Sequence, residues 1–160
     1  EYILTNKELE SYVDTNDEWI TSRTGIKERR ILKGEGLGTS YMAIKCAEDL
    51  IQKSNINPEE IDLVLVGTAT PDLPVASTAA YVASKIGATN AFSYDLQAAC
   101  SSFLFGMSTA ASYIESGRYK KVLLIGADKC LLLSITQIEQ RVLFLVMEQE
   151  QFCLSQIMKV

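Results

Sequence analysis

Three short apolar segments, each bounded by turn-forming residues, constrain the fold of this chain more than any other feature. The segment IDLVLVGTA (61–69) lacks the alternation of a strand with one solvated face, so it predicts a strand covered on both faces. AFSYDL (91–96) and KKVLLIGAD (120–128) predict two more strands. Strands buried on both faces are typical of a mostly parallel sheet, which needs crossover connections between its strands.

Helical patterns occupy most of the chain around these strands. We expect helices at 7–13, 14–26, 39–54, 76–86 and 100–116. Residues 27–38 are basic and then rich in glycine, and their G-x-G-x-G spacing does not match the dinucleotide-binding fingerprint, so we expect a connection there. The alternation of helices and strands predicts an α/β fold, with helices on both faces of a mixed, mostly parallel sheet.

Charge and composition exclude several classes of protein. The 160 residues carry a formal net charge of −5, whereas a general nucleic-acid-binding protein needs clustered Lys and Arg. No apolar run reaches the roughly 18 residues of a membrane-spanning helix, and the opening EYILTNKELE does not resemble a signal peptide. The four cysteines lack metal-binding spacing and there is no histidine, so we expect no metal site. A reducing, cytoplasmic location fits these cysteines best.

The end of the chain breaks the pattern of the first 129 residues. Residues 130–160 contain none of the nine glycines or three prolines, although an α/β domain needs a turn residue about every ten positions. The composition favours a C-terminal helix, yet the periodicity is poor, and the fragments LLLSI and VLFLV resemble strands. We therefore divide the chain into an N-terminal half-domain, 1–129, and an anomalous tail, 130–160.

A shifted reading frame is one explanation for this tail. When the third base of each codon is read with the first two bases of the next, Met147–Glu148 must give Gly and Phe152–Cys153 must give Leu. Over 145–153 the shifted frame can read Gly-Asp-Gly-Ala-Gly-Ala-Val-Leu, a glycine-rich turn that leads into a strand. The alternative is an authentic, divergent tail.

Cys100 is the strongest candidate for chemistry. In FSYDLQAACSSF (92–103) a buried strand ends, small residues follow, and a cysteine opens a long helix. The unpaired N–H groups and partial positive charge of a helix N-terminus favour thiolate over thiol, and they can stabilise the oxyanion of a thioester under attack. A cysteine at a helix start is more often a small buried hydrophobe, so the pattern alone leaves both interpretations open.

Four sequence runs together resemble the β-ketoacyl-acyl-carrier-protein synthase III family: DTNDEWITSRTGIKERR, GTATPD, DLQAACSSF and SGRYKKVLLIGAD. The resemblance covers 1–129 and implies the N-terminal half of a thiolase-like fold, within a subunit that normally forms a homodimer. It implies transfer of an acyl group, typically acetyl, from coenzyme A to Cys100. Condensation with malonyl-acyl-carrier protein and release of carbon dioxide would follow. Acyl-CoA is then a substrate, and no cofactor is implied. The family also carries the shifted-frame motif next in its sequence.

The positions of these motifs also imply a coenzyme A site. Trp19 resembles the tryptophan that stacks on the adenine, and Arg23 resembles an arginine that contacts a phosphate of the same ligand. Thr15 resembles a hydroxyl contact to coenzyme A. Each residue also has an ordinary structural interpretation, with Trp19 as a core anchor, Arg23 in a surface ion pair and Thr15 as a helix cap.

Departures from the family pattern limit what this chain can do. Ser102 stands where the family usually has glycine, so we expect it to crowd the turn after Cys100. Val75 and Ala76 replace a Phe-Pro pair whose ring helps shape the acyl pocket, which leaves the primer length open. The family's catalytic histidine and asparagine belong to the second half, so we expect that this chain alone does not condense.

Other functions stay open as alternatives. The chain could be a non-catalytic fragment that binds coenzyme A or a fragment that fails to fold. It could also be a polyketide-type or hydroxymethylglutaryl-coenzyme A synthase of the same superfamily, although the DEWI and RTGI runs favour the bacterial fatty acid type. The basic run KERRILK (27–33) could meet a phosphate or an acidic carrier protein, or be a solvated connection.

Overall fold

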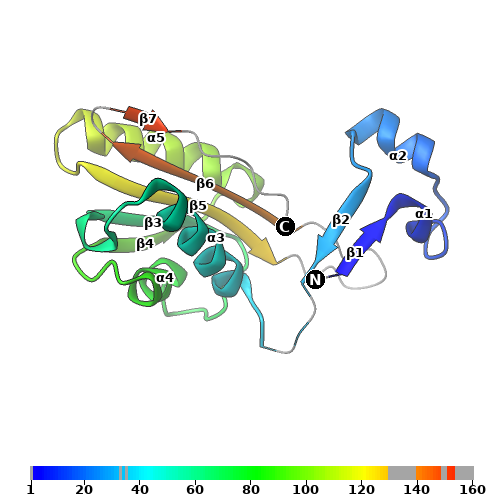
Figure 1. Cartoon of the computed structure of the whole chain (residues 1–160), viewed down its shortest axis with the longest axis horizontal. Coiled ribbons are helices and arrows are strands. Elements are labelled where there is room, and N and C mark those ends of the chain that lie inside the picture. Colours follow the sequence, from blue (N-terminus) through cyan, green and yellow to red (C-terminus); the bar gives the residue numbers. More distant parts are fainter. Residues whose placement is uncertain (1, 33, 35, 130–139, 149–150, 154–160) are drawn as a thin grey trace.

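The three expected strands form one side of a five-stranded sheet (Figure 1). They are β3 (Leu63–Gly67), β4 (Phe92–Leu96) and β5 (Lys121–Lys129). The computed structural model describes residues 2–32, 34, 36–129, 140–148 and 151–153. The strand order is β4-β3-β5-β6-β7, where β6 is Gln140–Glu148 and β7 is Gln151–Cys153, and β3 is parallel to both β4 and β5. The expected α/β class and mixed sheet are therefore confirmed.

The order of the strands places helices on both faces of the sheet. The chain passes from β3 through α4 (Thr78–Ile86) to β4 on one side, then through α5 (Ser102–Glu115) to β5 on the other. Right-handed crossovers that run in opposite directions lie on opposite faces. The helix α3 (Thr39–Ser54) shares the α4 face, as Figure 1 shows.

Burial of β3 on both faces explains its continuous apolar sequence. Val64 and Val66 pack against α3 and α4, whereas Leu63 and Leu65 pack against α5. Side chains alternate between the two faces of a strand, so each face takes every second residue. All four side chains are fully buried. A polar residue at any of them would lose its hydration without gaining a partner.

A small N-terminal lobe lies beside the sheet (Figure 1). It contains β1 (Tyr2–Thr5), α1 (Asn6–Leu9), α2 (Asp17–Thr24) and β2 (Glu28–Ile31). The antiparallel pair β1–β2 was not expected, and the prediction of a plain connection over 27–38 was wrong there. Four-residue strands give little periodicity, and the charged sequence ERRI does not resemble a strand. The first helix is also shorter than the predicted 7–13.

Asn6 organises this lobe from its centre. Its side chain is buried, and its Nδ2 donates hydrogen bonds to Asp17 Oδ1 and to the Ile26 carbonyl, both at 2.7 Å. Its Oδ1 accepts a bond from Arg29 Nη1 at 2.6 Å. One amide thus links α1, α2 and β2. Arg29, part of the basic run, is held by this bond.

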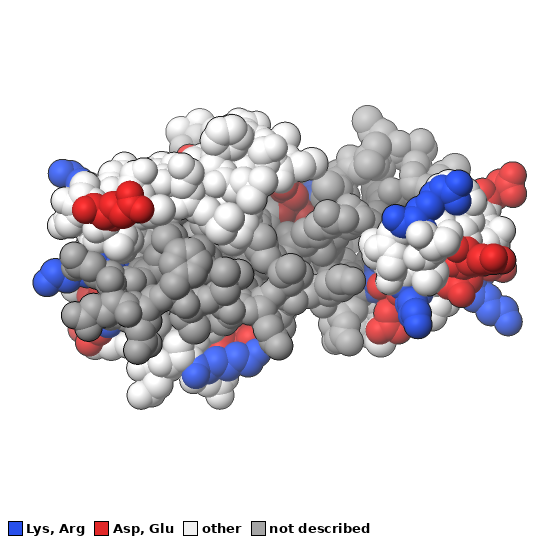
Figure 2. Space-filling view, turned by 90° about the horizontal axis from the view of Figure 1, so that it is seen from above, with Lys and Arg blue, Asp and Glu red and all other residues white. Residues whose placement is uncertain are grey.

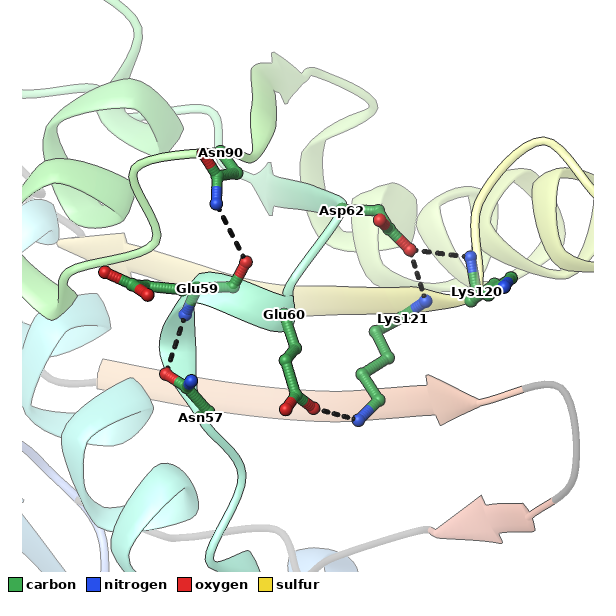
Figure 3. Close-up of polar contacts among 7 residues, drawn as sticks. All are labelled: Asn57, Glu59, Glu60, Asp62, Asn90, Lys120 and Lys121. Atoms are coloured by element: carbon green, nitrogen blue, oxygen red, sulfur yellow. Dashed lines mark hydrogen bonds and ion pairs between the residues drawn. The ribbon is translucent and has the colours of Figure 1, made fainter.

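A polar clamp joins the amino ends of β3 and β5 (Figure 3). Asp62 Oδ2 accepts hydrogen bonds from the backbone N–H groups of Lys120 and Lys121, at 2.7 and 2.9 Å. Lys121 Nζ also forms an ion pair with Glu60 at 2.6 Å. Exposed ion pairs of this kind contribute about 1 kcal/mol or less, so the backbone bonds to Asp62 matter more for the register.

The tail continues the sheet where the structure describes it. β6 (Gln140–Glu148) pairs antiparallel with β5, and β7 (Gln151–Cys153) pairs antiparallel with β6. The fragment VLFLV is therefore a strand, and the C-terminal helix is wrong over these residues. The fragment LLLSI lies outside the described residues. In the described part of the chain, no helix is long and apolar enough to cross a membrane.

Candidate functional site

Cys100 lies between the carboxyl end of β4 and the start of α5. β4 ends at Leu96, and a short 3-10 turn, η2 (Ala99–Ser101), leads directly into α5. Cys100 is exposed and its thiol is free. The carboxyl ends of parallel strands are the edge at which α/β proteins bind ligands. Cys100 therefore lies between a strand and a helix as expected, but in the turn before α5 rather than in its first residue. It is not a buried hydrophobe, and its role as a nucleophile stays a prediction.

Three glycines bring α5 unusually close to the sheet. A Cβ on Gly67, the last residue of β3, would lie 2.9 Å from Ser102 Cβ. A Cβ on Gly126, the register partner of Gly67 in β5, would lie 3.2 Å from the Phe103 ring. Gly106 in α5 likewise faces Leu124 without a side chain of its own. The first turn of α5, and with it Cys100, is therefore held directly over the end of β3.

Ser102 does not crowd the turn after Cys100, and that expectation was wrong. Ser102 is 3% exposed, and Gly67 leaves the space that its side chain fills. Its Oγ accepts a hydrogen bond from the Ala98 N–H at 2.8 Å and donates one to the Ala99 carbonyl at 2.7 Å. Ala99, whose carbonyl accepts the second of these bonds, has φ +47°, in the left-handed region that residues other than glycine rarely adopt.

A carboxylate at the end of β5 fixes the loop that follows β3. Asp128 Oδ1 accepts bonds from Thr68 Oγ1, the Ala69 N–H and Thr70 Oγ1, at 3.1, 2.7 and 3.2 Å. Thr70 Oγ1 in turn accepts the Lys129 N–H at 2.9 Å. The gap between the carboxyl ends of β3 and β5 is therefore filled by a hydrogen-bonded network rather than left open.

The far end of the same loop, where α4 begins, is tied to β4. Asp95 in β4 accepts bonds from the N–H groups of Thr78 and Ala79, both at 2.7 Å, and from Ser77 Oγ at 3.1 Å. A carboxylate at a helix N-terminus accepts hydrogen bonds from the free N–H groups, and its negative charge interacts favourably with the helix dipole. Val75 projects from the loop with 98% of its surface exposed, so within the described chain it lines no acyl pocket.

A second cysteine has the opposite environment. Cys46 is 2% exposed in the core between α3 and the sheet. Burial raises the pKa of the Cys46 thiol to about 12, with a smaller contribution from the Asp49 charge. Cys46 is therefore a packing residue of the core. Cys130 lies outside the described residues.

The three residues expected to meet coenzyme A lie together in the N-terminal lobe. Trp19 on α2 is 52% exposed and is therefore not a core anchor. The Arg23 guanidinium lies over its ring, 4.5 Å from the centroid, and no carboxylate of the described residues pairs with Arg23. Asn16, not Thr15, caps α2 by accepting the Trp19 N–H at 2.8 Å. Thr15 Oγ1 is buried without a hydrogen-bond partner among the described residues.

Charge is distributed unevenly over the molecule. Figure 2 shows acidic and basic side chains gathered on the N-terminal lobe, and a nearly uncharged area over α5. This helix has no charged residue between Ser102 and Ile114, and it exposes Leu104 and Phe105 by 64% and 58%. Trp19 and Arg23 thus lie in a charged lobe, whereas Cys100 lies at the edge of an apolar surface.

Comparison with known proteins points to one family. The family model described as 3-oxoacyl-[acyl-carrier-protein (ACP)] synthase III matches residues 94–144. The chain is 58% identical over 129 residues to β-ketoacyl-[acyl-carrier-protein] synthase III 2 of Bacteroides thetaiotaomicron. This alignment covers 81% of this chain and 38% of that protein. Over this stretch the chain is similar to proteins of the synthase III family. It spans about two fifths of the length of the relatives that it matches.

Solved structures of the synthase III family agree with the fold. The Aquifex aeolicus VF5 enzyme is 46% identical with a TM-score of 0.73, and the match covers 81% of this chain and 41% of that one. The priming β-ketosynthase of the R1128 polyketide pathway is 34% identical with a TM-score of 0.72, covering 80% and 38%. The chain therefore has part of the thiolase-like fold of these condensing enzymes.

Sequence reasoning missed several residues that build the site. Asp95 and Asp128 are single acids at the carboxyl ends of apolar strands, and that position was the available signal. Ser102 was noticed as a departure, but its contact with Gly67 could not be read from the chain because 34 residues separate them. The structure brings Gly67 to Ser102, beside Cys100, and leaves Trp19 and Arg23 in the N-terminal lobe.

Proposed function

We propose that Cys100 accepts an acyl group from coenzyme A, as the first step of a condensing reaction that starts fatty acid synthesis. The observation that carries this proposal is an exposed, free thiol at the junction of β4 and α5, in a chain similar to proteins of the synthase III family. Cys100 Sγ forms a bond to the acyl carbon while the bond between that carbon and the coenzyme A sulfur breaks. The thiol proton leaves with coenzyme A, so the exchange balances.

The coenzyme A end of this proposal involves α2. Trp19 offers an exposed ring face for the adenine, and the Arg23 guanidinium beneath the ring adds positive charge near the phosphates. Thr15 Oγ1 is buried next to this helix and has no hydrogen-bond partner among the described residues, so its hydrogen-bonding capacity is left for a ligand. Cytoplasmic coenzyme A pools would supply the substrate.

Condensation needs groups that this chain does not carry. Malonyl-acyl-carrier protein would be the second substrate, and decarboxylation places negative charge on the thioester oxygen, which needs hydrogen-bond donors. The 160 residues contain no histidine. We therefore propose that this chain accepts the acyl group slowly and does not condense it.

Acylation of Cys100 tests the proposal directly. Incubation with acetyl-CoA should add one acetyl group, and peptide mass spectrometry should locate it on Cys100. Cys100→Ala should abolish the label, whereas Ser112→Ala on the exposed face of α5 should leave it unchanged. Trp19 fluorescence that responds to coenzyme A while no acetyl group is transferred would instead favour the non-catalytic binding fragment.

We further propose that residues from about 130 onward are read in a shifted frame. The sharp change in composition supports this, as does the 129-residue alignment of the relatives, although the match to the family model continues to residue 144. Sequencing of the coding DNA from the codon of Ala127 to that of Phe152 should find the third-base frame open, with Gly-Asp-Gly-Ala-Gly-Ala-Val-Leu. A stop codon in that frame would contradict the proposal and make the tail authentic.

Assembly and primer choice belong to the same proposal. β4 is an edge strand, and edge strands and exposed apolar surfaces such as that over α5 associate readily, which supports a homodimer but also the alternative of an aggregating fragment. Similarity to a polyketide priming synthase keeps a longer primer open. Acylation by butyryl-CoA in preference to acetyl-CoA would favour that alternative.

A further inference from the structure

Ser102 connects the sheet to the turn that carries Cys100. The Ser102 hydroxyl bonds the Ala98 N–H and the Ala99 carbonyl, so it spans the two residues before Cys100. The Ala99 carbonyl and the Cys100 N–H belong to one peptide plane. Fixing that carbonyl therefore fixes the direction of the Cys100 N–H, which is the nearest backbone donor to a thioester at Sγ.

The turn needs such a support because it is strained. Ala99 has φ +47°, a backbone conformation that is unfavourable for a residue with a Cβ. Strained residues persist where the surrounding structure holds them. The two bonds of Ser102 close a ring around Ala99 and supply that hold.

The sheet keeps Ser102 itself in place. Ser102 is 3% exposed and lies against Gly67 at the end of β3, where an added Cβ would come within 2.9 Å of its own. The backbone of Gly67 is fixed by parallel pairing on both sides, with Leu96 and with Gly126. The position of the central strand is thus transmitted through one side chain to the turn.

From this geometry we infer that Ser102 is a positioning residue, which orients the Cys100 turn for attack on a bound thioester. The inference rests on the proposed role of Cys100 as the acyl acceptor. Ser102 acts through the backbone of Ala98 and Ala99 and does not touch the reacting atoms. An oriented reaction depends on such positioning, since misplacement by about 1 Å can cost roughly 100-fold in rate. Attack on a small, freely diffusing reagent depends on it far less.

Comparison of two reactions of Cys100 tests this role. In the full chain, Ser102→Ala should slow acylation of Cys100 by acetyl-CoA by roughly ten-fold or more. Alkylation of Cys100 by iodoacetamide should change by less than about two-fold. The matched control is Ser112→Ala, whose Oγ donates to the Ser108 carbonyl on the same helix, and both rates should stay at the parent values.

Each contrary outcome has a distinct meaning. Equal acylation of the parent and Ser102→Ala would overturn the role of Ser102 and leave that of Cys100 intact. A fall in acylation accompanied by iodoacetamide labelling of Cys46 would mean that Ser102 only stabilises the fold, and would also overturn the inference. A parent chain that iodoacetamide alkylates at Cys100 but acetyl-CoA does not acylate would refute the proposed function, and the role of Ser102 with it.

Discussion

Iodoacetamide should alkylate Cys100 in the native chain at pH 8 and leave Cys46 unmodified. The reactive species is the thiolate, and access to it decides the rate. Cys100 is exposed, whereas Cys46 is buried with a pKa raised to about 12. At pH 8 only about one Cys46 in 10,000 would be ionised even before access is considered. We expect Cys46 to react roughly 1,000-fold more slowly, or slower still.

The pH dependence of Cys46 has a definite sign. Its ordinary pKa is 9.0 and the folded state raises it, so the folded state favours the protonated thiol. The stability that this preference contributes is complete below pH 9 and is lost as the pH rises towards about 12. Cys46 labelling should therefore increase steeply above pH 9, through both ionisation and loosening of the core.

Peptide mass spectrometry reads each cysteine separately and so provides the measurement. In 6 M guanidinium chloride the two cysteines should react at similar rates, because unfolding removes the difference in burial. The variant Cys46→Ala should leave the native labelling of Cys100 unchanged. Equal labelling of both thiols in the native chain at pH 8 would contradict the packing of α3 against the sheet.

The central sheet could be predicted from the sequence because its signals are local. Apolar runs without alternation marked β3 and β5. Gly25 and Gly87, both with left-handed backbones, directly follow the last residues of α2 and α4, and glycine at a helix end is a local signal. The pair β1–β2 was missed because its four-residue strands are stabilised by contacts outside themselves, above all the bonds of Asn6 to Asp17 and Arg29. Such contacts leave no periodic pattern.

The candidate site was predictable only in part, for a similar reason. A cysteine after a strand and before a helix is visible in one stretch of sequence, so Cys100 could be found. The residues that hold its turn come from elsewhere, and Gly67 in particular has no side chain to draw attention to it. What matters at Gly67 is the space left for Ser102, and space appears only when two segments are folded together.

Substitution of Gly67 by alanine should cost about 1–3 kcal/mol of unfolding free energy, the usual range for overpacking a core. The added Cβ would lie 2.9 Å from Ser102 Cβ, 3.1 Å from the Ser102 carbonyl carbon and 3.3 Å from its oxygen. The last two are backbone atoms, which cannot rotate away. Gly126→Ala is the matched control, because its Cβ would meet the Phe103 side chain, which can shift. Urea unfolding of both variants gives the comparison.

Loss of the Ser102 side chain should partly rescue Gly67→Ala. Ser102→Gly alone removes the hydrogen bonds to the half-buried Ala98 N–H and to the Ala99 carbonyl, at a cost of about 0.5–1.5 kcal/mol each. In the double variant the 2.9 Å conflict disappears, so the two losses should sum to less than their separate values. The backbone contacts stay, and the rescue is therefore incomplete. Strict additivity of the two losses would show that Gly67 and Ser102 do not share one space, and α5 would then owe its position to Gly106 and Gly126 alone.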